Sequence, residues 1–192
     1  ILQKELTEKD FKLLNKTIIM LDYNPEKLKK LSYSEILKEG KKFEEKIENF
    51  QYEIIQKKNF EREKIKRYKS VISKLKIIRE AQIKYYNKFG KYTKNKSELL
   101  KYTQGENIDL FKVPYTEKEF EIDTSTVEKV KGLIIPVFIV KTDKESILNG
   151  LNSKLIEREK EAISSDEVKG EFLSVGSLEN VLTSSNWPDK YD

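Results

Sequence analysis

The chain contains no cysteine and no histidine among its 192 residues. Without cysteine it forms neither a disulfide nor a thiolate site, and it gives no indication of redox compartment. Without histidine it lacks the commonest general base and the commonest metal ligand. An enzyme would have to work with Asp, Glu, Ser, Lys or Tyr alone. We therefore predict a protein that is not an enzyme and that has no catalytic, cofactor-binding or metal-binding residues.

Long apolar runs are missing as well. A membrane-spanning helix needs about 20 consecutive apolar residues. The longest apolar run here, Leu133 to Val140, has the length of a strand and is interrupted by Pro136. We predict no membrane span in this chain.

Charge of neither sign dominates. The 38 basic and 33 acidic residues are interleaved and leave a net charge of +5. A mild excess of this kind favours solubility and a weak attraction to polyanions, and nucleic acid is not an expected partner. Charged residues make up 37% of the chain and hydrophobic residues also 37%, a balance typical of much solvated helix.

Residues 34–89 are dominated by helix formers and contain no proline, which favours one long helix with a stutter over two helices with a bend. Its first apolar residues follow a four, three, four spacing, which is typical of a coiled-coil seam. We expect the chain to form homo-oligomers through these residues, Phe43, Ile47, Phe50 and Ile54.

A second seam follows a charged stretch of the same helix. Continuing the first register through that stretch places Lys57, Glu61 and Lys64 inward. The three/four spacing then resumes at Tyr68, Val71, Leu75, Ile78, Gln82, Tyr85 and Phe89. We interpret both seams as surfaces for pairing helices.

Gly90 ends the helix, because glycine readily adopts the left-handed conformation that closes a helix end. Ser97 is expected to open a short second helix that folds back on the first. Around this stop we expect Tyr85, Phe89 and Leu99 to be the best-buried residues.

The rest of the chain is rich in strand-forming residues. We predict strands at Ile108–Tyr115, Lys118–Val127 and Leu133–Lys141, forming an antiparallel meander packed on the helix, with Leu133–Val140 most buried. Phe172–Leu178 is a candidate edge strand. The fold class we predict is α+β, a long helical arm followed by a small antiparallel sheet.

The polar end of the chain carries the only tryptophan. Trp187 and Tyr191 are rigid aromatic residues of the kind that anchor protein interfaces. Either they form such an interface from a flexible tail, or Trp187 folds back onto the edge of its own sheet.

A basic segment in the middle of the helix has two interpretations. It could follow the phosphates of a polyanion, but Glu61 and Glu63 interrupt it and favour a solvated face with pairing along the helix. The segment comprises Lys57, Lys58, Arg62, Lys64, Lys66, Arg67 and Lys69.

The helix end resembles the junction in type IV pilins and type II pseudopilins. The matching segment is IREAQIKYYNKFGKYTKNKSELLKY, and its matching positions are Ala81, Tyr85, Gly90, Tyr92 and Leu99. The resemblance implies a long helix that runs through a turn into a sheet.

Three separated segments resemble a group of uncharacterised proteins of Bacteroidota genomes and their marine tailed phages. These segments are FEREKIKRYKSVISKLKIIREAQ, LIIPVFIV and VGSLENV with NWPDKY, and together they span Asn59 to Asp192. The resemblance brings no activity with it. Many bacterial members look like single-pass membrane proteins anchored just before the long helix, whereas Ser34–Lys58 of this chain is charged.

From these observations we expect three parts: a helical arm (1–63), a pilin-like α+β domain (64–183) and a C-terminal tail (184–192). The expected function is that of a non-enzymatic structural subunit of a multi-protein assembly, first of all a phage tail or neck component located in the virion. Its expected partners are other protein subunits of that assembly. The alternatives are a pilin-like protein of the bacterial envelope whose anchor lies upstream of Ile1, and a polyanion- or glycan-binding module. The alternative locations are the cell envelope and the cytoplasm.

Overall fold

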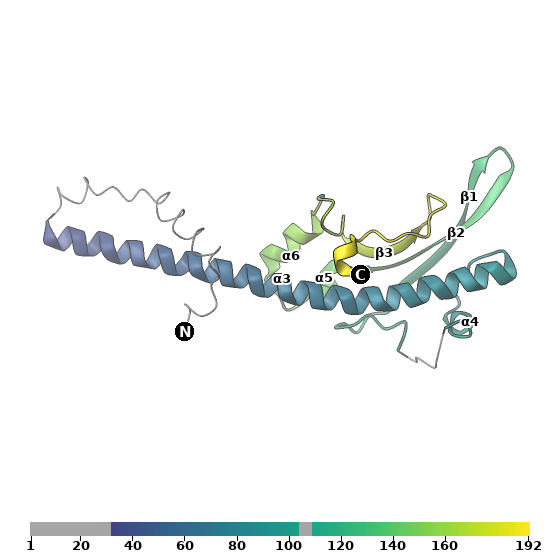
Figure 1. The fold of residues 1–192 in the computed structure, drawn as a ribbon, viewed down its shortest axis with the longest axis horizontal. Coiled ribbons are helices and arrows are strands. Elements are labelled where there is room, and N and C mark those ends of the chain that lie inside the picture. The colour runs from purple at the N-terminus through teal and green to yellow at the C-terminus, as the bar shows by residue number, and fades with distance from the viewer. Residues whose placement is uncertain (1–31, 104–108) are drawn as a thin grey trace. The chain divides into compact units, whose positions relative to one another are not determined.

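The computed structural model describes residues 32–103 and 109–192 (Figure 1). The chain divides into two compact units, Ile1–Glu61 and Arg62–Asp192. The first part of the predicted arm, residues 1–31, lies outside the described residues. The two units are taken separately below.

Helix α3 runs without a break from Tyr33 to Phe89, over 57 residues. This confirms the prediction of one long helix. In the first unit Ile47 and Phe50 of the first seam are half-buried and Ile54 is buried, while the side chain of Phe43 lies outside the description. Self-association through this seam stays a prediction.

The second seam of α3 is buried within the second unit. Tyr68, Val71, Leu75, Ile78 and Gln82 are completely inaccessible to solvent. A three/four spacing serves a helix on a sheet as well as it serves a pair of helices. The interpretation of this face as a helix-pairing surface is therefore wrong, because the domain itself covers it.

The aromatic residues at the end of α3 differ in burial. Tyr85 is buried and Leu99 is fully buried, as expected, whereas Phe89 is 45% exposed. The Phe89 ring lies on Tyr85, at 4.5 Å between ring centroids, and against Tyr102 at 6.4 Å. As the last residue of the helix it has neighbours on one side only, and its predicted deep burial is wrong.

Three antiparallel strands form a sheet of order β1-β2-β3, with β1 at Glu121–Val130, β2 at Leu133–Asp143 and β3 at Phe172–Ser177. Helices α5 (Lys144–Leu148) and α6 (Ser153–Lys160) connect β2 to β3. An α+β fold is thus confirmed.

The first predicted strand, Ile108–Tyr115, is not one. Its described part forms turns and a single bridge between Lys112 and Glu119. Leu110, Phe111 and Val113 are buried there. Residues of these types are common in strands because they suit buried positions, and here they are buried without pairing in a sheet. The candidate edge strand, Phe172–Leu178, forms the third strand of the sheet instead, as β3.

The hairpin of β1 and β2 extends past the third strand (Figure 1). Strand β2 pairs with β1 from Leu133 to Lys141, but it meets β3 only from Phe138 onwards. The distal half of the hairpin is therefore two-stranded. Leu133 and Ile134, predicted to be in the most buried strand, are 52% and 64% exposed for this reason.

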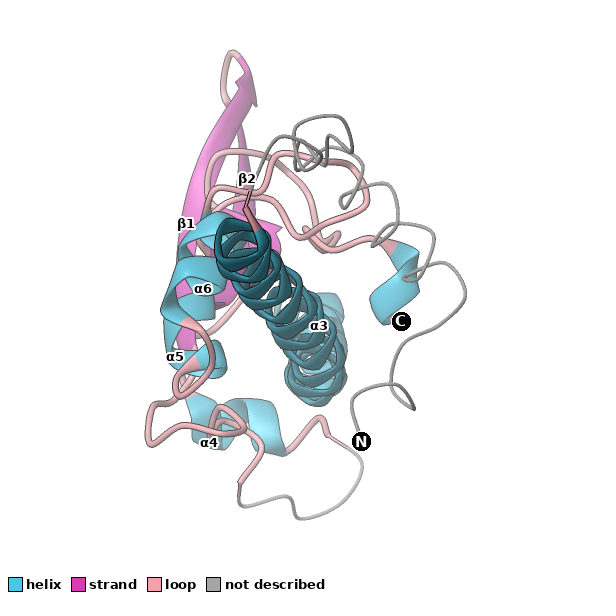
Figure 2. Cartoon of the chain, turned by 90° about the vertical axis from the view of Figure 1, so that its left-hand side faces the viewer, coloured by secondary structure: helices cyan, strands magenta, loops and turns pink. Residues whose placement is uncertain are grey.

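The short helix α4 (Lys96–Leu100) lies below α3, whereas the strands lie above it (Figures 1 and 2). Its N-cap is Asn95, whose side chain accepts a hydrogen bond from the Glu98 N–H at 3.2 Å. The predicted second helix is thus present and begins slightly earlier than Ser97.

The end of the chain belongs to the domain. The Gly176 N–H donates to the Ser184 carbonyl at 2.9 Å, and the Asn186 N–H donates to the Ser174 carbonyl at 3.2 Å, so this segment lines the free edge of β3. A 3₁₀ turn, η2, follows at Asp189–Tyr191.

The two aromatic residues of this segment are inside the fold. Trp187 is 7% exposed and Tyr191 is 1% exposed. The ring of Tyr191 packs edge-on to Tyr68 of α3 at 5.4 Å, and the Trp187 indole N–H donates to Asp192 at 2.9 Å. Of the two alternatives for the end of the chain, the structure shows the one in which it packs on its own domain. Trp187 and Tyr191 are therefore not exposed interface anchors, and residues 184–192 are not a separate tail in this structure.

Substitution of Gly176 in β3 tests how closely β3 packs against β2. Its φ is +79°, and an added Cβ would lie 2.2 Å from the Phe138 carbonyl oxygen. Gly176→Ala should therefore lower the free energy of unfolding by about 3 kcal/mol, from a left-handed backbone plus a clash with main chain. Urea unfolding measures the loss.

Gly170→Ala is the matched control. Gly170 also has a positive φ, of +72°, but an added Cβ would meet nothing within 4 Å. It should lose only about 1 kcal/mol, the backbone cost by itself. Equal losses in the two variants would contradict the close contact between β3 and β2.

Candidate functional site

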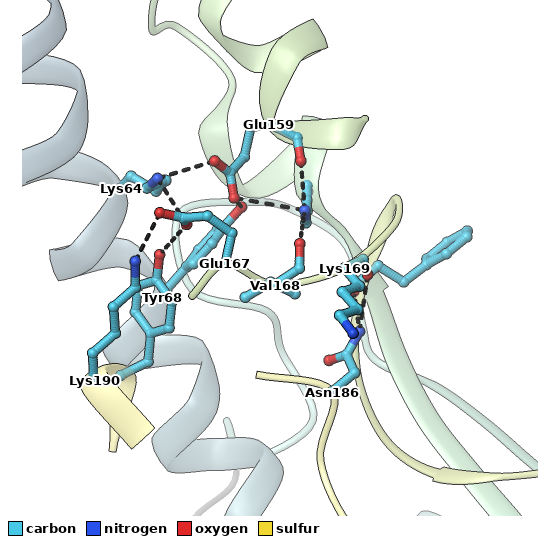
Figure 3. Close-up of polar contacts among 11 residues, drawn as sticks. Lys64, Tyr68, Glu159, Glu167, Val168, Lys169, Asn186 and Lys190 are labelled. Atoms are coloured by element: carbon cyan, nitrogen blue, oxygen red, sulfur yellow. Dashed lines mark hydrogen bonds and ion pairs between the residues drawn. The ribbon is translucent and has the colours of Figure 1, made fainter. Parts of the chain in front are cut away.

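An ionic network with a buried centre joins α3 to the C-terminal half of the second unit (Figure 3). Helix α3 contributes two of its members, α5, α6 and the loop after α6 contribute one each, and η2 contributes two. The members are Lys64, Tyr68, Lys144, Glu159, Glu167, Lys190 and Tyr191.

Glu159 of α6 is the most enclosed acid of the network, with 6% of its side chain exposed. Lys64 donates to its Oε2 at 3.0 Å, and the Tyr68 hydroxyl donates to its Oε1 at 3.2 Å. Lys64 itself is 1% exposed. A buried carboxylate is tolerated only with such compensation, because an unpaired one would cost several kcal/mol.

Glu167 follows in the loop after α6. It accepts hydrogen bonds from Lys64 at 3.2 Å, Lys190 at 2.7 Å and the Tyr191 hydroxyl at 2.7 Å. Burial by itself raises the pKa of Glu167, but the bonds from Lys190 and Tyr191 and the charge of Lys64 outweigh it and hold that pKa below its usual value. The carboxylate therefore stays ionised.

Lys144 of α5 is completely buried. Its ammonium group donates to the main-chain oxygens of Glu159 and Val168, each at 2.6 Å, and lies 3.6 Å from the Glu159 carboxylate. Burial lowers the pKa of Lys144 in spite of that carboxylate. By these bonds the side chain ties α5 to the end of α6 and to the loop behind it.

Tyr68 completes the inner part of the network. Burial raises the pKa of its hydroxyl above the usual range, and the neighbouring Glu159 raises it further. The hydroxyl therefore remains a hydrogen-bond donor. Since both carboxylates accept several bonds from positively charged or hydroxyl donors, the arrangement suits holding segments together better than exchanging protons with a substrate.

The network was not foreseen as a site, although part of its signal is in the sequence. Continuing the seam through the charged stretch places Lys64 inward, one helical turn before Tyr68, and an inward lysine in an apolar register requires a buried partner. The acids that meet it are 95 and 103 residues away. Nothing in one sequence connects residues at that separation.

The polar cluster near the end of α3 has a local role. Gln82 is fully buried, donates to the Thr93 carbonyl at 2.6 Å and accepts from the Thr93 N–H at 3.2 Å. It thus fixes the chain just after the Gly90 stop. The nearby tyrosines pack with one another and with the sheet, as Tyr92 does against Phe138 at 4.5 Å.

Arg67 of the basic segment is also used by the fold. Its guanidinium group donates to the carbonyls of Ile147 and Asn149 at 2.9 and 2.8 Å, at the end of α5. The predicted solvated face is therefore wrong for Arg67 and for Lys64, and it holds for the exposed Lys57, Lys66 and Lys69.

Ligand sites are sparse in the described part of the chain. Within residues 32–103 and 109–192, no group of three or more acidic side chains is placed to hold a metal ion. A hollow on the sheet is lined by Glu121, Asp123, Lys141 and Glu179 among others. Asp123 is held there by Lys94, and Glu121 lies 3.3 Å from Lys141.

No described helix is both long enough and apolar enough to cross a membrane. Comparison of the chain with protein-family models, with curated proteins and with solved structures finds no match. The functional argument therefore depends on the geometry of the chain itself.

The network makes a direct prediction for Glu159. Glu159→Gln should lower the free energy of unfolding by about 3 kcal/mol, because it leaves Lys64 and Lys144 facing an uncharged group in the interior. Urea or thermal unfolding measures the loss. Glu117→Gln is the control, since it removes an exposed ion pair to Lys112 and should cost about 0.5 kcal/mol or less. A Glu159 variant as stable as the control would contradict the structural role of the network.

Proposed function

We propose that this chain is a non-enzymatic structural subunit that joins other protein subunits through its β1–β2 hairpin. The observation that carries the proposal is a group of exposed apolar residues at the end of that hairpin. We name this group the hairpin patch: Val130, Leu133 and Ile134, which are 65%, 52% and 64% exposed.

The hairpin patch lies where the sheet is weakest. A two-stranded hairpin without a covering layer is only marginally stable in water. The distal half has no third strand among the described residues, since β3 begins to pair at Phe138. Leu133 and Ile134 are consecutive residues of β2 and face opposite sides of the hairpin, and Val130 is the partner of Leu133. Exposed apolar residues on both faces of a projecting element are typical of an element that another protein covers.

The body behind the hairpin suits a structural role. The buried ionic network and the packed C-terminal segment tie α3, α5, α6 and η2 into one unit. A projecting hairpin can hold two subunits together only when its base is fixed to the rest of its own subunit. In this chain the base of the hairpin continues into buried residues of β2, Phe138 and Val140.

As the assembly we propose a phage virion, with the chain in its tail or neck. The support is the resemblance of three separated sequence segments to proteins of Bacteroidota and their tailed phages. A pilin-like envelope protein is the alternative, supported by the resemblance around Gly90. Recovery of the chain in purified particles, in a copy number that fits the particle symmetry, tests the first; recovery only in envelope fractions would favour the second.

The contact itself is tested by polar substitution of the hairpin patch. We expect the wild-type chain to associate with increasing concentration in sedimentation velocity runs. Leu133→Thr with Ile134→Thr keeps strand propensity, removes the apolar surface and should weaken association about tenfold or more. Circular dichroism should show an unchanged fold.

Val181→Thr with Leu182→Thr is the matched control, because these two residues are exposed and apolar but lie outside the hairpin. It should associate as the wild type does. A chain that stays monomeric at every concentration, or a hairpin variant that associates like the control, would contradict the proposal.

A further inference from the structure

The outer edge of β1 is open. The order of the sheet places β1 at its border, paired only with β2 over residues 121–130. Within residues 32–103 and 109–192, no other strand or bridge lies along it. Seven of its ten residues are exposed, and the other three are half-buried. One main-chain donor of this strand, the Thr124 N–H, is bonded to the Asp123 side chain at 3.0 Å. A ten-residue strand at the border of a sheet is otherwise a template for another strand.

The distal hairpin has a second open edge, on β2, and there the chain is protected. Pro136 lies on β2 opposite Thr126, in the part that β3 does not reach. Proline has no N–H to donate and blocks strand addition. Strand β1 contains no proline. Of the two open edges, only that of β1 is suited to a partner strand.

The charges along β1 are arranged symmetrically about Thr126. Asp123 and Lys129 lie three residues to either side of it, and Glu121 and Lys131 lie five residues to either side. Glu121 and Asp123 thus precede Thr126, and both lysines follow it together with one further acid, Glu128. Counted along the sequence, an antiparallel second copy centred on Thr126 would present lysine opposite each of these two acids. Lys129 lies at the register irregularity of β1 and Lys131 in the turn that follows the strand.

We propose that a second copy of this chain pairs with the open edge of β1, antiparallel and about a two-fold axis at Thr126, so that two three-stranded sheets join into one of six strands. A two-fold contact uses the same surface on both copies, as this charge arrangement requires. The inference rests on the proposed function, since it names the partner of the hairpin as a second copy.

The contributions to this pairing differ in kind. Main-chain hydrogen bonds between the two β1 strands and burial of apolar residues beside them would supply the affinity. Asp123 and Glu121 already have partners in their own chain, Lys94 and Lys141, and are more than half exposed. Ion pairs of this kind are weak, so the charges fix the register. In this register Glu128 faces Thr124, and no like charges meet.

Because the chain contains no cysteine, a single introduced cysteine can report the register of the two β1 strands through disulfide crosslinking. In the chain of residues 1–192, Thr126→Cys places two cysteines directly opposite each other across the axis, with Cα atoms about 5 Å apart, within the range that a disulfide spans. Thr124→Cys is the matched control, because its two copies are four residues out of register, about 13 Å apart. Under mild oxidation Thr126→Cys should form dimers about tenfold faster than Thr124→Cys.

A mixing experiment checks the register independently. Thr124 lies opposite Glu128 of the second copy, so Thr124→Cys and Glu128→Cys chains should each crosslink poorly alone and readily when mixed. Lys129→Glu should slow the crosslinking of Thr126→Cys, and adding Asp123→Lys to it should restore the rate, because like charges opposite each other destabilise a strand pair.

Equal crosslinking of Thr126→Cys and Thr124→Cys, with no gain on mixing, overturns the two-fold pairing. If association then still depends on Leu133 and Ile134, the proposed function stands and the partner strand lies elsewhere. If the wild-type chain is monomeric and none of the cysteine variants crosslinks, the pairing and the assembly role both fail.

Discussion

The pairing of Lys64 with Glu159 and Glu167 is the constraint on which the second unit depends. A lysine that lies inward on a long helix must meet buried acceptors, and here they come from two positions about a hundred residues later in the chain. Glu167 in turn holds Lys190 and Tyr191, so the end of the chain is fixed to the same helix. Lys144 of α5 donates to the main-chain oxygens of Glu159 in α6 and of Val168 in the following loop, and thereby fixes both segments to α5.

The predictable parts of the fold are those that depend on local pattern. The absence of proline and the apolar spacing predicted α3 almost to the residue, and Gly90 predicted its end. The partner of a face is not a local property. The apolar spacing from Tyr68 to Tyr85 is the same whether the helix packs against another helix or against a sheet. It was interpreted as a helix-pairing surface, whereas this face of α3 is covered by its own domain. Ile108–Tyr115 was mistaken for a strand because burial and strand pairing favour the same residues.

The site was predictable in part only. The register that places Lys64 inward was visible, but its acids were not, since their proximity arises from the crossover through α5 and α6. The same holds for Trp187 and Tyr191: their aromatic character pointed to an interface, and the fold uses them internally. With Trp187 and Tyr191 enclosed, the end of the hairpin carries exposed apolar residues on a projecting element, Val130, Leu133 and Ile134. The division between an ionically tied body and a two-stranded projection is the physical basis for proposing an assembly subunit.

Native-state hydrogen exchange tests this division most directly. If the network ties the end of the chain to α3, the amides of Gly176 and Asn186, which bond to residues 184 and 174, should open with nearly the free energy of the α3 amides at residues 71–81. The amides of the distal hairpin should exchange much faster. Fast exchange at Gly176 and Asn186, with α3 still protected, would contradict the claim that the network fixes the C-terminal segment to the helix.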